Sequence, residues 1–249
     1  MALKLLLLNI EGTKHYPEVT NLIKKERPDV LCLQEVPRVF LNTIEKIGYS
    51  TTYLPRCVKR QDNGNVFEDG IVIASNKAHS ATTHNYFTTD LPNDQYSKSL
   101  KRRHNNHGVI VAEITHQNKK YIIANTHFTW AADGKKASET QIADMKKLLS
   151  YLQTLPPHIF CGDLNIPRAY NKLYKELIKE YSDAIPKDIK TSLDKTHHRM
   201  SNEEGKQVLL ETFMVDYILT KPEYAVSNVR QICGVSDHCA VIADIYVSK

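Results

Sequence analysis

Short apolar runs recur along this chain and alternate with amphipathic segments, and this alternation limits the folds open to it. The first run covers Leu3 to Leu8 and is followed by an amphipathic stretch from Tyr16 to Glu26. A second run at Val30 to Leu33 precedes a second such stretch at Val39 to Ile47. Apolar runs of this length suit buried strands, whereas the amphipathic segments have helical spacing. The pattern predicts the order β-α-β-α and hence an α/β fold.

The middle of the chain is richer in strands. Strand-like runs follow one another without helices between them at Gly70 to Ala74, Ala81 to Phe87, Val109 to Thr115 and Tyr121 to Asn125. Consecutive strands of this kind predict an antiparallel meander.

A helix is predicted after Ser138, because Ser138 and Gln141 have the spacing of a capping box. Apolar residues then repeat at helical spacing, at Ile142, Met145, Leu149 and Leu152, before Pro156 and Pro157 end the segment. Further strand-like runs follow at His158 to Cys161, Phe213 to Leu219 and Cys239 to Val247. We find no repeat or flexible linker, so residues 1–249 are predicted to form one domain.

Three long polar stretches are candidate surface loops. They cover Arg56 to Glu68, Leu91 to His107 and Lys187 to Gln207. Loops of this length in a compact domain often line a functional site.

Composition restricts the classes of partner. A hydrophobic fraction of 41% is enough for a core and argues against disorder, while a formal charge of +5 mildly favours polyanionic partners. The first apolar run is interrupted by Asn9 and Glu11, so we interpret it as a strand and not as a leader peptide. No run reaches the ~20 apolar residues of a transmembrane helix, and we expect no membrane partner.

The cysteines indicate a reducing compartment. Their number is odd, no pair has Cys-x-x-Cys spacing, and three of them lie in apolar runs; they are Cys32, Cys57, Cys161, Cys233 and Cys239. Buried, reduced thiols in a cytoplasmic protein, expected to be a monomer, fit this usage.

Nearly every apolar run is bordered by a polar residue of a kind that binds metal or phosphate. These residues are Asn9, Gln34-Glu35, Asn125-Thr126-His127, Asp163 with Asn165, Asp216, and Ser236-Asp237-His238. Each one alone is better explained as a cap or a turn residue. Open α/β sheets bind ligands beyond strand ends, however, so residues far apart in sequence can converge there.

The segment Gly162-Asp163-Leu164-Asn165 is the most informative of these sites. In an extended backbone, side chains two residues apart point to the same side, so Asp163 and Asn165 would face one space. Gly162 would leave room for something to approach. A carboxylate that accepts a proton beside a non-titrating amide suits the handling of water next to a phosphate. A Gly-Asp turn followed by an Asn cap is the structural alternative.

The ordered set of motifs resembles the endonuclease/exonuclease/phosphatase family, which includes deoxyribonuclease I. The motifs are Leu8-Asn9-Ile10, Leu33-Gln34-Glu35-Val36, Asn125-Thr126-His127-Phe128, Gly162-Asp163-Leu164-Asn165, Val215-Asp216-Tyr217-Ile218 and Ser236-Asp237-His238-Cys239, and the resemblance spans Leu5 to Ile245. It implies a four-layer α/β sandwich, in which two mixed β-sheets pack face to face and are flanked by helices. The active site would lie at one edge of this sandwich.

The resemblance also implies roles for these residues. Glu35 would be the principal metal ligand, with Asn9 and Asp237 beside it, and such oxygen ligands suit Mg²⁺ or Mn²⁺. Asp163 would deprotonate the attacking water. The remaining catalytic residues would act on the phosphate or on one another: Asn165 and His127 would bind the phosphoryl oxygens, and Asp216 would hold a cationic His238. A zinc site built from His197, His198, Cys233 and Cys239 is a rival interpretation, although its spacing matches no usual pattern.

Three further features of the sequence are candidates for substrate binding. Lys101, Arg102 and Arg103 form a basic segment that could follow a phosphate backbone or be a solvated loop. Trp130 could stack on a base or pack its own loop. Arg168 could clamp a phosphate or lie on the surface.

Departures within the family favour one branch. Val36 and Pro37 stand where exonuclease III-like abasic endonucleases usually have Thr-Lys, and His127 belongs to a segment where they have a tyrosine. Both differences point toward the branch with deoxyribonuclease I and the tyrosyl-DNA phosphodiesterases. We therefore expect a metal-dependent phosphodiesterase acting on nucleic acid, with DNA foremost, as a nuclease or DNA-end-processing enzyme. The alternatives are a phosphatase or phospholipase C-type hydrolase of inositol phosphates or sphingolipids, and a silent phosphate-binding module.

Overall fold

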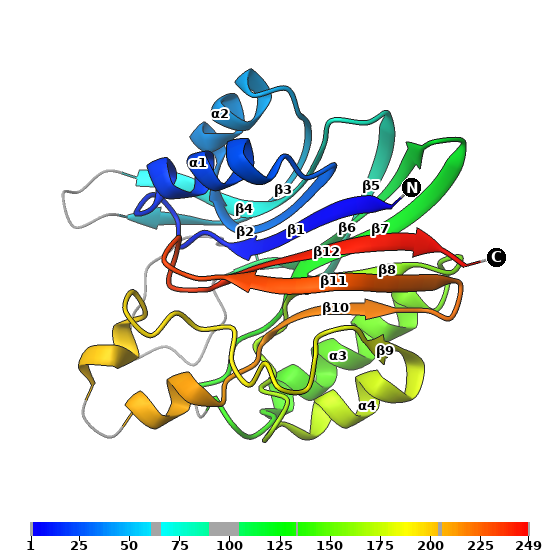
Figure 1. The fold of residues 1–249 in the computed structure, drawn as a ribbon. Helices are drawn as coiled ribbons and strands as arrows, with labels where there is room; N and C mark the ends of the chain where they lie inside the picture. The colour runs from blue at the N-terminus through cyan, green and yellow to red at the C-terminus, as the bar shows by residue number, and fades with distance from the viewer. Residues whose placement is uncertain (1, 61–65, 90–104, 133, 204–205, 249) are drawn as a thin grey trace.

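The strands form two six-stranded sheets that lie face to face (Figure 1). The computed structural model describes residues 2–60, 66–89, 105–132, 134–203 and 206–248. The first sheet has the order β11-β12-β1-β2-β4-β3 and contains β1 (Leu3–Asn9), β2 (Val30–Pro37), β3 (Ser50–Arg60), β4 (Val66–Ser75), β11 (Tyr224–Ile232) and β12 (Ala240–Val247). The second has the order β5-β6-β7-β8-β10-β9 and contains β5 (His79–Phe87), β6 (His107–His116), β7 (Lys119–His127), β8 (Ile159–Asp163), β9 (Ser182–Asp183) and β10 (Asp216–Thr220).

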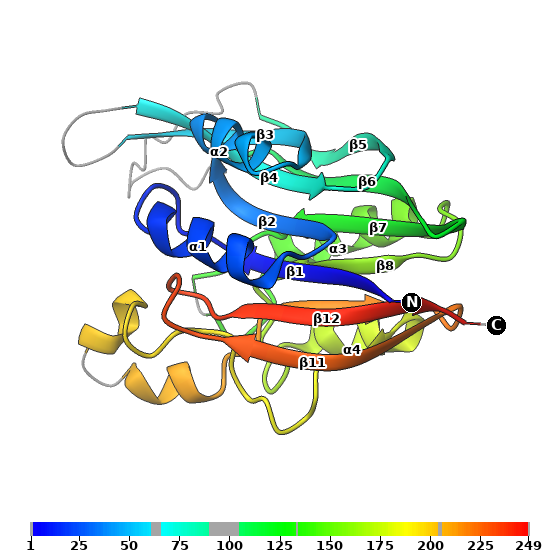
Figure 2. The same ribbon diagram turned by 45° about the horizontal axis from the view of Figure 1, so that its top comes forward.

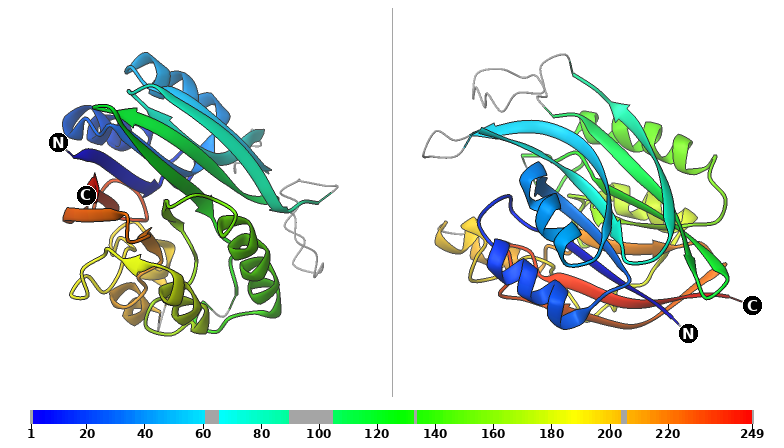
Figure 3. Two further views of the ribbon diagram at one scale, coloured as in Figure 1. Left: turned by 90° about the vertical axis from the view of Figure 1, so that its right-hand side faces the viewer. Right: turned by 90° about the horizontal axis from the view of Figure 1, so that it is seen from above.

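Helices cover the outer faces of both sheets (Figure 2). Residues of α1 (Tyr16–Glu26) and α2 (Leu41–Lys46) pack on the first sheet, and residues of α3 (Glu139–Leu152) and α4 (Lys172–Glu180) pack on the second. Short 3₁₀ helices are η1 (Arg38–Phe40), η2 (Arg199–Asn202) and η3 (Gln207–Glu211). The predicted four-layer α/β sandwich is therefore confirmed, and Figure 3 shows the strand layers from two further directions.

The leucine run of β1 is explained by burial on both faces. Leu5 and Leu7 belong to the core between the two sheets, whereas Leu6 and Leu8 pack under the helices with Val19 and Leu22. Successive strand side chains point to opposite faces, so a strand buried on both sides needs no polar alternation.

Each sheet has one parallel pair near its centre, and this arrangement brings the strand ends together. In the first sheet β1 runs parallel to β2, with Asn9 opposite Gln34. In the second sheet β7 runs parallel to β8, with His127 opposite Asp163. The antiparallel strand β10 starts at Asp216, which lies opposite Asp163. Polar residues from distant parts of the sequence thus meet at one edge.

Several predicted elements are confirmed. Strands β5, β6 and β7 form the antiparallel meander, and Ser138 caps α3 with the predicted capping box. The first strand predicted for this meander, Gly70 to Ala74, is wrong in its placement, because it belongs to β4 of the other sheet and pairs there with β2 and β3. The buried face of α3 differs from the predicted stripe, since Ile142 is 38% exposed while Gln141 and Asp144 are buried. The polar members of that face have a function in the site, as described below.

The predicted loop from Arg56 to Glu68 is wrong at both ends. Strand β3 continues to Arg60 and β4 begins at Val66, and the two pair along their length. Because β3 is an edge strand, its polar residues do not give the apolar signal of a central strand. Of the predicted loop Leu91 to His107, residues 91–104 lie outside the described residues, and its end, His107, starts β6. Within the described part of Lys187 to Gln207 the structure contains η2.

The prediction of five reduced thiols is corrected. Cys32, Cys57 and Cys161 are buried free thiols, but Cys233 and Cys239 form a disulfide. Cys233 directly follows β11, and Cys239 directly precedes β12. The adjacent strand residues, Ile232 and Ala240, are paired opposite each other. Among the described residues, no helix combines the length and the apolar character needed to cross a membrane.

Candidate active site

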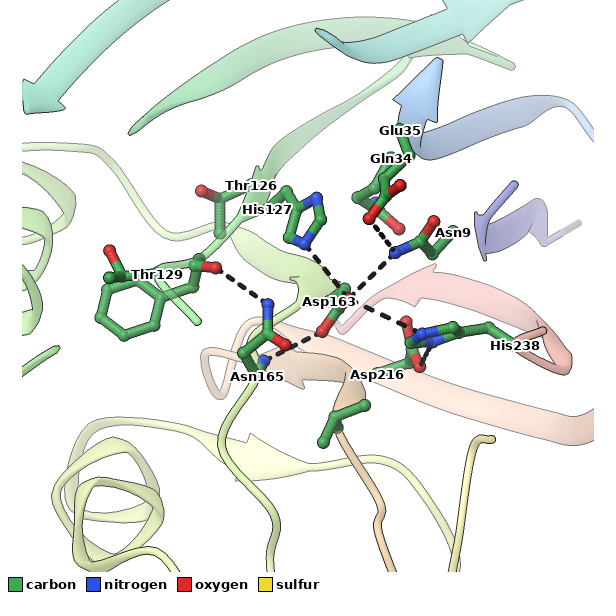
Figure 4. Close-up of polar contacts among 12 residues, drawn as sticks. Asn9, Gln34, Glu35, Thr126, His127, Thr129, Asp163, Asn165, Asp216 and His238 are labelled. Carbon is green, nitrogen blue, oxygen red and sulfur yellow. Dashed lines mark hydrogen bonds and ion pairs between the residues drawn. The ribbon is translucent and has the colours of Figure 1, made fainter. Parts of the chain in front are cut away.

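Asp163 lies at the centre of the polar strand ends (Figure 4). Its Oδ2 accepts a hydrogen bond from Asn9 Nδ2 at 3.1 Å and lies 3.3 Å from His127 Nε2 and 3.9 Å from His238 Nε2. Its Oδ1 accepts the backbone N–H of Asn165 at 2.9 Å. The structure thus brings four other predicted site residues to the carboxylate of Asp163.

The surroundings of Asp163 make its carboxylate a stronger base than an ordinary aspartate. The side chain is buried, and the negative charge of Asp216 lies nearby. Burial and this charge raise the pKa of Asp163 to about 7, against the opposing effect of His238. A carboxylate with such a pKa can accept a proton near neutral pH.

Asn165 reaches the site by a turn and not by an extended strand. Strand β8 ends at Asp163, and Asn165 has a left-handed backbone with φ of 51°. Its side chain is fixed by a hydrogen bond from Nδ2 to the carbonyl of Phe128 at 3.0 Å. Gly162 leaves room for the neighbouring strand and not for a ligand, because a Cβ there would lie 1.9 Å from the carbonyl oxygen of Thr126. The extended backbone predicted for this segment is therefore replaced by a turn, and the prediction that Gly162 leaves room for a ligand is wrong.

His238 is paired with Asp216 behind Asp163. Its Nδ1 lies 2.7 Å from Asp216 Oδ2, and both side chains are buried. Burial disfavours the cation, but the charge of Asp216 and this hydrogen bond raise the pKa of His238 well above its ordinary value. The sequence-based pairing of these two residues agrees with this geometry.

The segment before His238 is anchored to residues that the sequence analysis did not select. Ser192 accepts the backbone N–H groups of Val215 and Asp216 on its Oγ, each at 3.1 Å, and its carbonyl accepts the N–H of Cys239 at 2.7 Å. The N–H of Asp194 donates to the carbonyl of Asp237 at 2.8 Å. A serine within a polar stretch gives no sequence signal for this function.

Glu35 and Asp237 carry the charges expected of a cation site. Glu35 has a left-handed backbone with φ of 53°, a conformation found at functional strand ends. Burial and the negative charges of Glu11 and Glu35 raise the pKa of Asp237 to about 6, despite the charge of His238. Asn9 Nδ2 lies 3.4 Å from Glu35 Oε1. Two carboxylates that repel one another, with an amide oxygen beside them, suit a divalent cation, so Glu35, Asp237 and Asn9 fit the predicted metal.

A cluster of charged residues behind Glu35 was missed by the sequence analysis. Lys59 Nζ lies 2.7 Å from Glu35 Oε2 and 2.7 Å from Asp69 Oδ2, while Arg56 Nη1 lies 2.5 Å from His127 Nδ1. Burial alone would raise the pKa of Glu35, but the surrounding positive charges, with that of Lys59 foremost, together outweigh burial and lower this pKa. Two cations spaced three apart in β3 are the signal that could have identified these residues.

The rival zinc site is not supported. Cys233 and Cys239 are joined to each other, so neither supplies a free thiolate. Among the described residues, one group with mutually close metal-binding atoms is Asp194, Cys233 and Cys239, and another is Asp163, Asp216 and His238. His198 lies near His238, with ring centroids 6.3 Å apart, and burial lowers its pKa to about 4.

A cavity of about 150 Å³ opens beside the polar cluster. Asn165 and His238 form part of its wall, and its remaining lining is both apolar and basic, including Leu193, Phe213, Arg199 and Lys206. Trp130 also lines the cavity and is 50% exposed. A cavity with this lining can take an apolar group that is attached to an anion.

The interpretation of Arg168 as a phosphate clamp is corrected. Its guanidinium contacts Asp183 Oδ2 at 3.1 Å and three backbone carbonyls, those of Ile185, Pro186 and Ile189. These contacts hold a loop and engage the guanidinium with structural partners. The candidate residues Lys101, Arg102 and Arg103 lie outside the described residues.

The buried polar face of α3 supports the loops of the site. Gln141 Nε2 donates to the carbonyls of Thr129 at 2.8 Å and Asn165 at 3.2 Å. Thr129 Oγ1 donates to Asp144 Oδ2 at 2.5 Å. The polar strand-end residues Gln34 and Asn125 also support the site, because Gln34 Nε2 donates to Asn125 Oδ1 at 2.7 Å and joins the two sheets behind it.

Comparisons with known proteins agree with this geometry. A family model described as Endonuclease/Exonuclease/phosphatase family matches residues 6–238. A DNA-(apurinic or apyrimidinic site) endonuclease from Dictyostelium discoideum is 28% identical over 171 residues, which cover 66% of this chain and 42% of that protein. The chain thus spans less than half the length of this curated relative.

Two solved structures share the fold. The human Nocturnin catalytic domain with bound sulfate has a TM-score of 0.67 at 20% identity, covering 99% of this chain and 94% of that chain. Truncated TDP2 from Caenorhabditis elegans has a TM-score of 0.59 at 16% identity, covering 99% of this chain and 98% of that chain. At such identities these likenesses show the fold alone. The family model, however, covers the segment from β1 to His238, and the chain therefore belongs to the endonuclease/exonuclease/phosphatase family.

Proposed function

We propose that the protein is a divalent-metal-dependent phosphodiesterase that hydrolyses nucleic acid, with DNA as the foremost substrate. The observation that carries this proposal is the position of Asp163, a buried carboxylate with a pKa of about 7 between His127, His238 and Asn9. The name of the Dictyostelium relative, a DNA endonuclease, supports nucleic acid as the substrate class.

Asp163 is the base in this proposal. A water molecule between Asp163 and the phosphorus atom gives its proton to the free carboxylate and attacks the phosphate. Asn9 orients the carboxylate through the hydrogen bond to Oδ2, and the backbone N–H of Asn165 orients it through Oδ1. The base is thereby held in one rotamer, so little orientation is lost on reaching the transition state.

Three side chains stabilise the charge that builds on the phosphoryl oxygens. His127 and Asn165 donate hydrogen bonds, and His238 supplies a positive charge maintained by Asp216. Donors that are already oriented before the reaction need no reorganisation when the charge develops. The departing oxygen carries the electron pair of the broken P–O bond.

Glu35, Asp237 and Asn9 would hold the cation, which we expect to be Mg²⁺ or Mn²⁺. A divalent cation there would offset the charge of the phosphodiester and of its alkoxide leaving group. Burial and the negative charges of Glu11 and Glu35 raise the pKa of Asp237. A bound cation would relieve the repulsion between these carboxylates, which supports a metal site here.

Removal of divalent cations is expected to abolish turnover. Excess chelator should stop hydrolysis, and added Mg²⁺ or Mn²⁺ should restore it. Glu35→Gln should raise the Mg²⁺ concentration for half-maximal rate by about 10-fold or more, because it removes the charge of the principal ligand. Glu45→Gln, a change on α2, is the matched control. Full activity in chelator would refute the metal requirement.

The cavity beside Asn165 and His238 fits a base or sugar next to the cleaved phosphate. Trp130→Ala is expected to raise KM by about 10-fold and to change kcat little, because stacking on an aromatic ring contributes about 1–3 kcal/mol. Trp130→Phe should retain most of this affinity. An unchanged KM for Trp130→Ala on every cleaved substrate would remove this residue from substrate binding.

One screen tests the proposed function. Purified protein with Mg²⁺ or Mn²⁺ is assayed on duplex, single-stranded, abasic and 5′-tyrosyl DNA, on RNA, on inositol phosphates and on sphingomyelin. Cleavage of nucleic acid is expected. Turnover restricted to the small or lipid phosphates, or no turnover at all, would contradict the proposal.

A further inference from the structure

Arg56 occupies a special position in β3. The pairing of β3 with β4 shifts by one residue between Pro55, which lies opposite Gly70, and Cys57, which lies opposite Asp69. Arg56 is therefore the extra residue of a β-bulge. Bulges redirect side chains, and here the long side chain of Arg56 is only 6% exposed and reaches His127 of the other sheet.

The contact between these residues restricts the proton positions on His127. Arg56 Nη1 lies 2.5 Å from His127 Nδ1, and a guanidinium can only donate. His127 Nδ1 must then be the unprotonated acceptor, which places the ring proton on Nε2. In a protonated imidazole Nδ1 also carries a proton, so the N–H of His127 would point at the N–H of Arg56.

The other ring nitrogen faces the site. His127 Nε2 lies 3.3 Å from Asp163 Oδ2, and Figure 4 shows one ring nitrogen directed at Asp163 and the other away from it. Asp69 is fully buried, and its Oδ1 lies 3.5 Å from Arg56 Nη1, so it forms an ion pair with the guanidinium. Asp69, Arg56 and His127 thus form a chain that ends at the site.

We propose that Arg56 is a positioning residue that fixes His127 as a neutral imidazole with its proton on Nε2, directed at the reacting phosphate. This inference deepens the proposed phosphodiesterase function and rests on it for the part played by His127. Arg56 itself is too buried to touch substrate, so it acts through the histidine.

The surroundings of His127 favour its neutral state. Burial and the positive charge of Arg56 lower the pKa of His127. A cationic His127 at 3.3 Å would pair with Asp163 and weaken it as a base. A neutral His127 donates a hydrogen bond without that effect, and two imidazoles can serve one site in different roles.

The tautomer is measured directly on metal-free protein labelled with ¹⁵N-histidine. Long-range ¹H–¹⁵N spectra distinguish a protonated from an unprotonated ring nitrogen, and the signals that vanish in His127→Gln identify this residue. At neutral pH we expect an unprotonated Nδ1 and a protonated Nε2. A wild-type His127 that is an imidazolium, or that carries its proton on Nδ1, would overturn the proposal.

Variants connect the tautomer with catalysis. Arg56→Met should give a tautomer mixture and lower kcat by about 10- to 100-fold, with KM changed by less than about 3-fold. Arg56→Lys retains a donor and should restore part of the Nε2 tautomer and part of kcat. Arg38→Met, at an arginine that pairs with Glu68, should alter neither the tautomer nor kcat. An unchanged kcat in a folded Arg56→Met protein would overturn the catalytic part. Since the wild-type spectrum needs no turnover, failure of the proposed function would be recognised separately.

Discussion

Asp163→Asn is expected to lower kcat by about 10³-fold, because it removes the group that accepts the proton of the attacking water. The amide has nearly the shape of the carboxylate and can still accept the N–H of Asn165, so the fold should persist. Rates under saturating substrate and Mg²⁺, with thermal unfolding of both proteins, measure the two effects.

The control for this variant is Asp188→Asn, which makes the same chemical change at an exposed position. It should leave kcat within about 2-fold of wild type, as expected for a surface substitution. If Asp163→Asn retained full activity in a folded protein, Asp163 would not be the base.

The second large effect is expected at the pair of His238 and Asp216. His238→Ala should lower kcat by about 10²- to 10³-fold, because a charge close to the reacting phosphate is lost. It also leaves the carboxylate of Asp216 buried without its 2.7 Å partner, and breaking a buried pair costs about 3–5 kcal/mol. Lower thermal stability should therefore accompany the lower rate.

Asp216→Asn separates charge from packing. It keeps a hydrogen-bond acceptor beside His238 but removes the charge that maintains the imidazolium, so a smaller loss of about 10- to 100-fold is expected. The double variant should be little worse than His238→Ala alone, because both changes act through the same ring. Strictly additive losses would show that Asp216 acts independently of His238.

The central strands could be predicted because burial on both faces leaves an unbroken apolar run. Leu3 to Leu8 became β1, and the polar residues that border such runs did converge, since the parallel pairs bring Asn9 and Asp163 to one edge. Periodicity could not predict β3, where packing on one partner strand allows polar residues such as Lys59. The residues of β3 that approach Glu35 and His127 were missed for the same reason.

Local sequence also could not predict which side-chain groups find structural partners. Arg168 follows the Asp163 motif closely, yet the carbonyls that bind it come from Ile185 to Ile189. The disulfide depends on the register of β11 with β12, which cysteine spacing does not encode. Such features arise from tertiary contacts that a single sequence leaves open.

The central claim is that a water molecule deprotonated by Asp163 attacks phosphorus. Hydrolysis of a nucleic-acid substrate in H₂¹⁸O with Mg²⁺ tests this claim most directly. A single turnover by the wild-type protein should place one ¹⁸O atom in the phosphoryl product and none in the departing alcohol, and Asp163→Asn should give no labelled product on that timescale. Cleavage without ¹⁸O on phosphorus, label in the alcohol, or the absence of any cleavage would contradict the account.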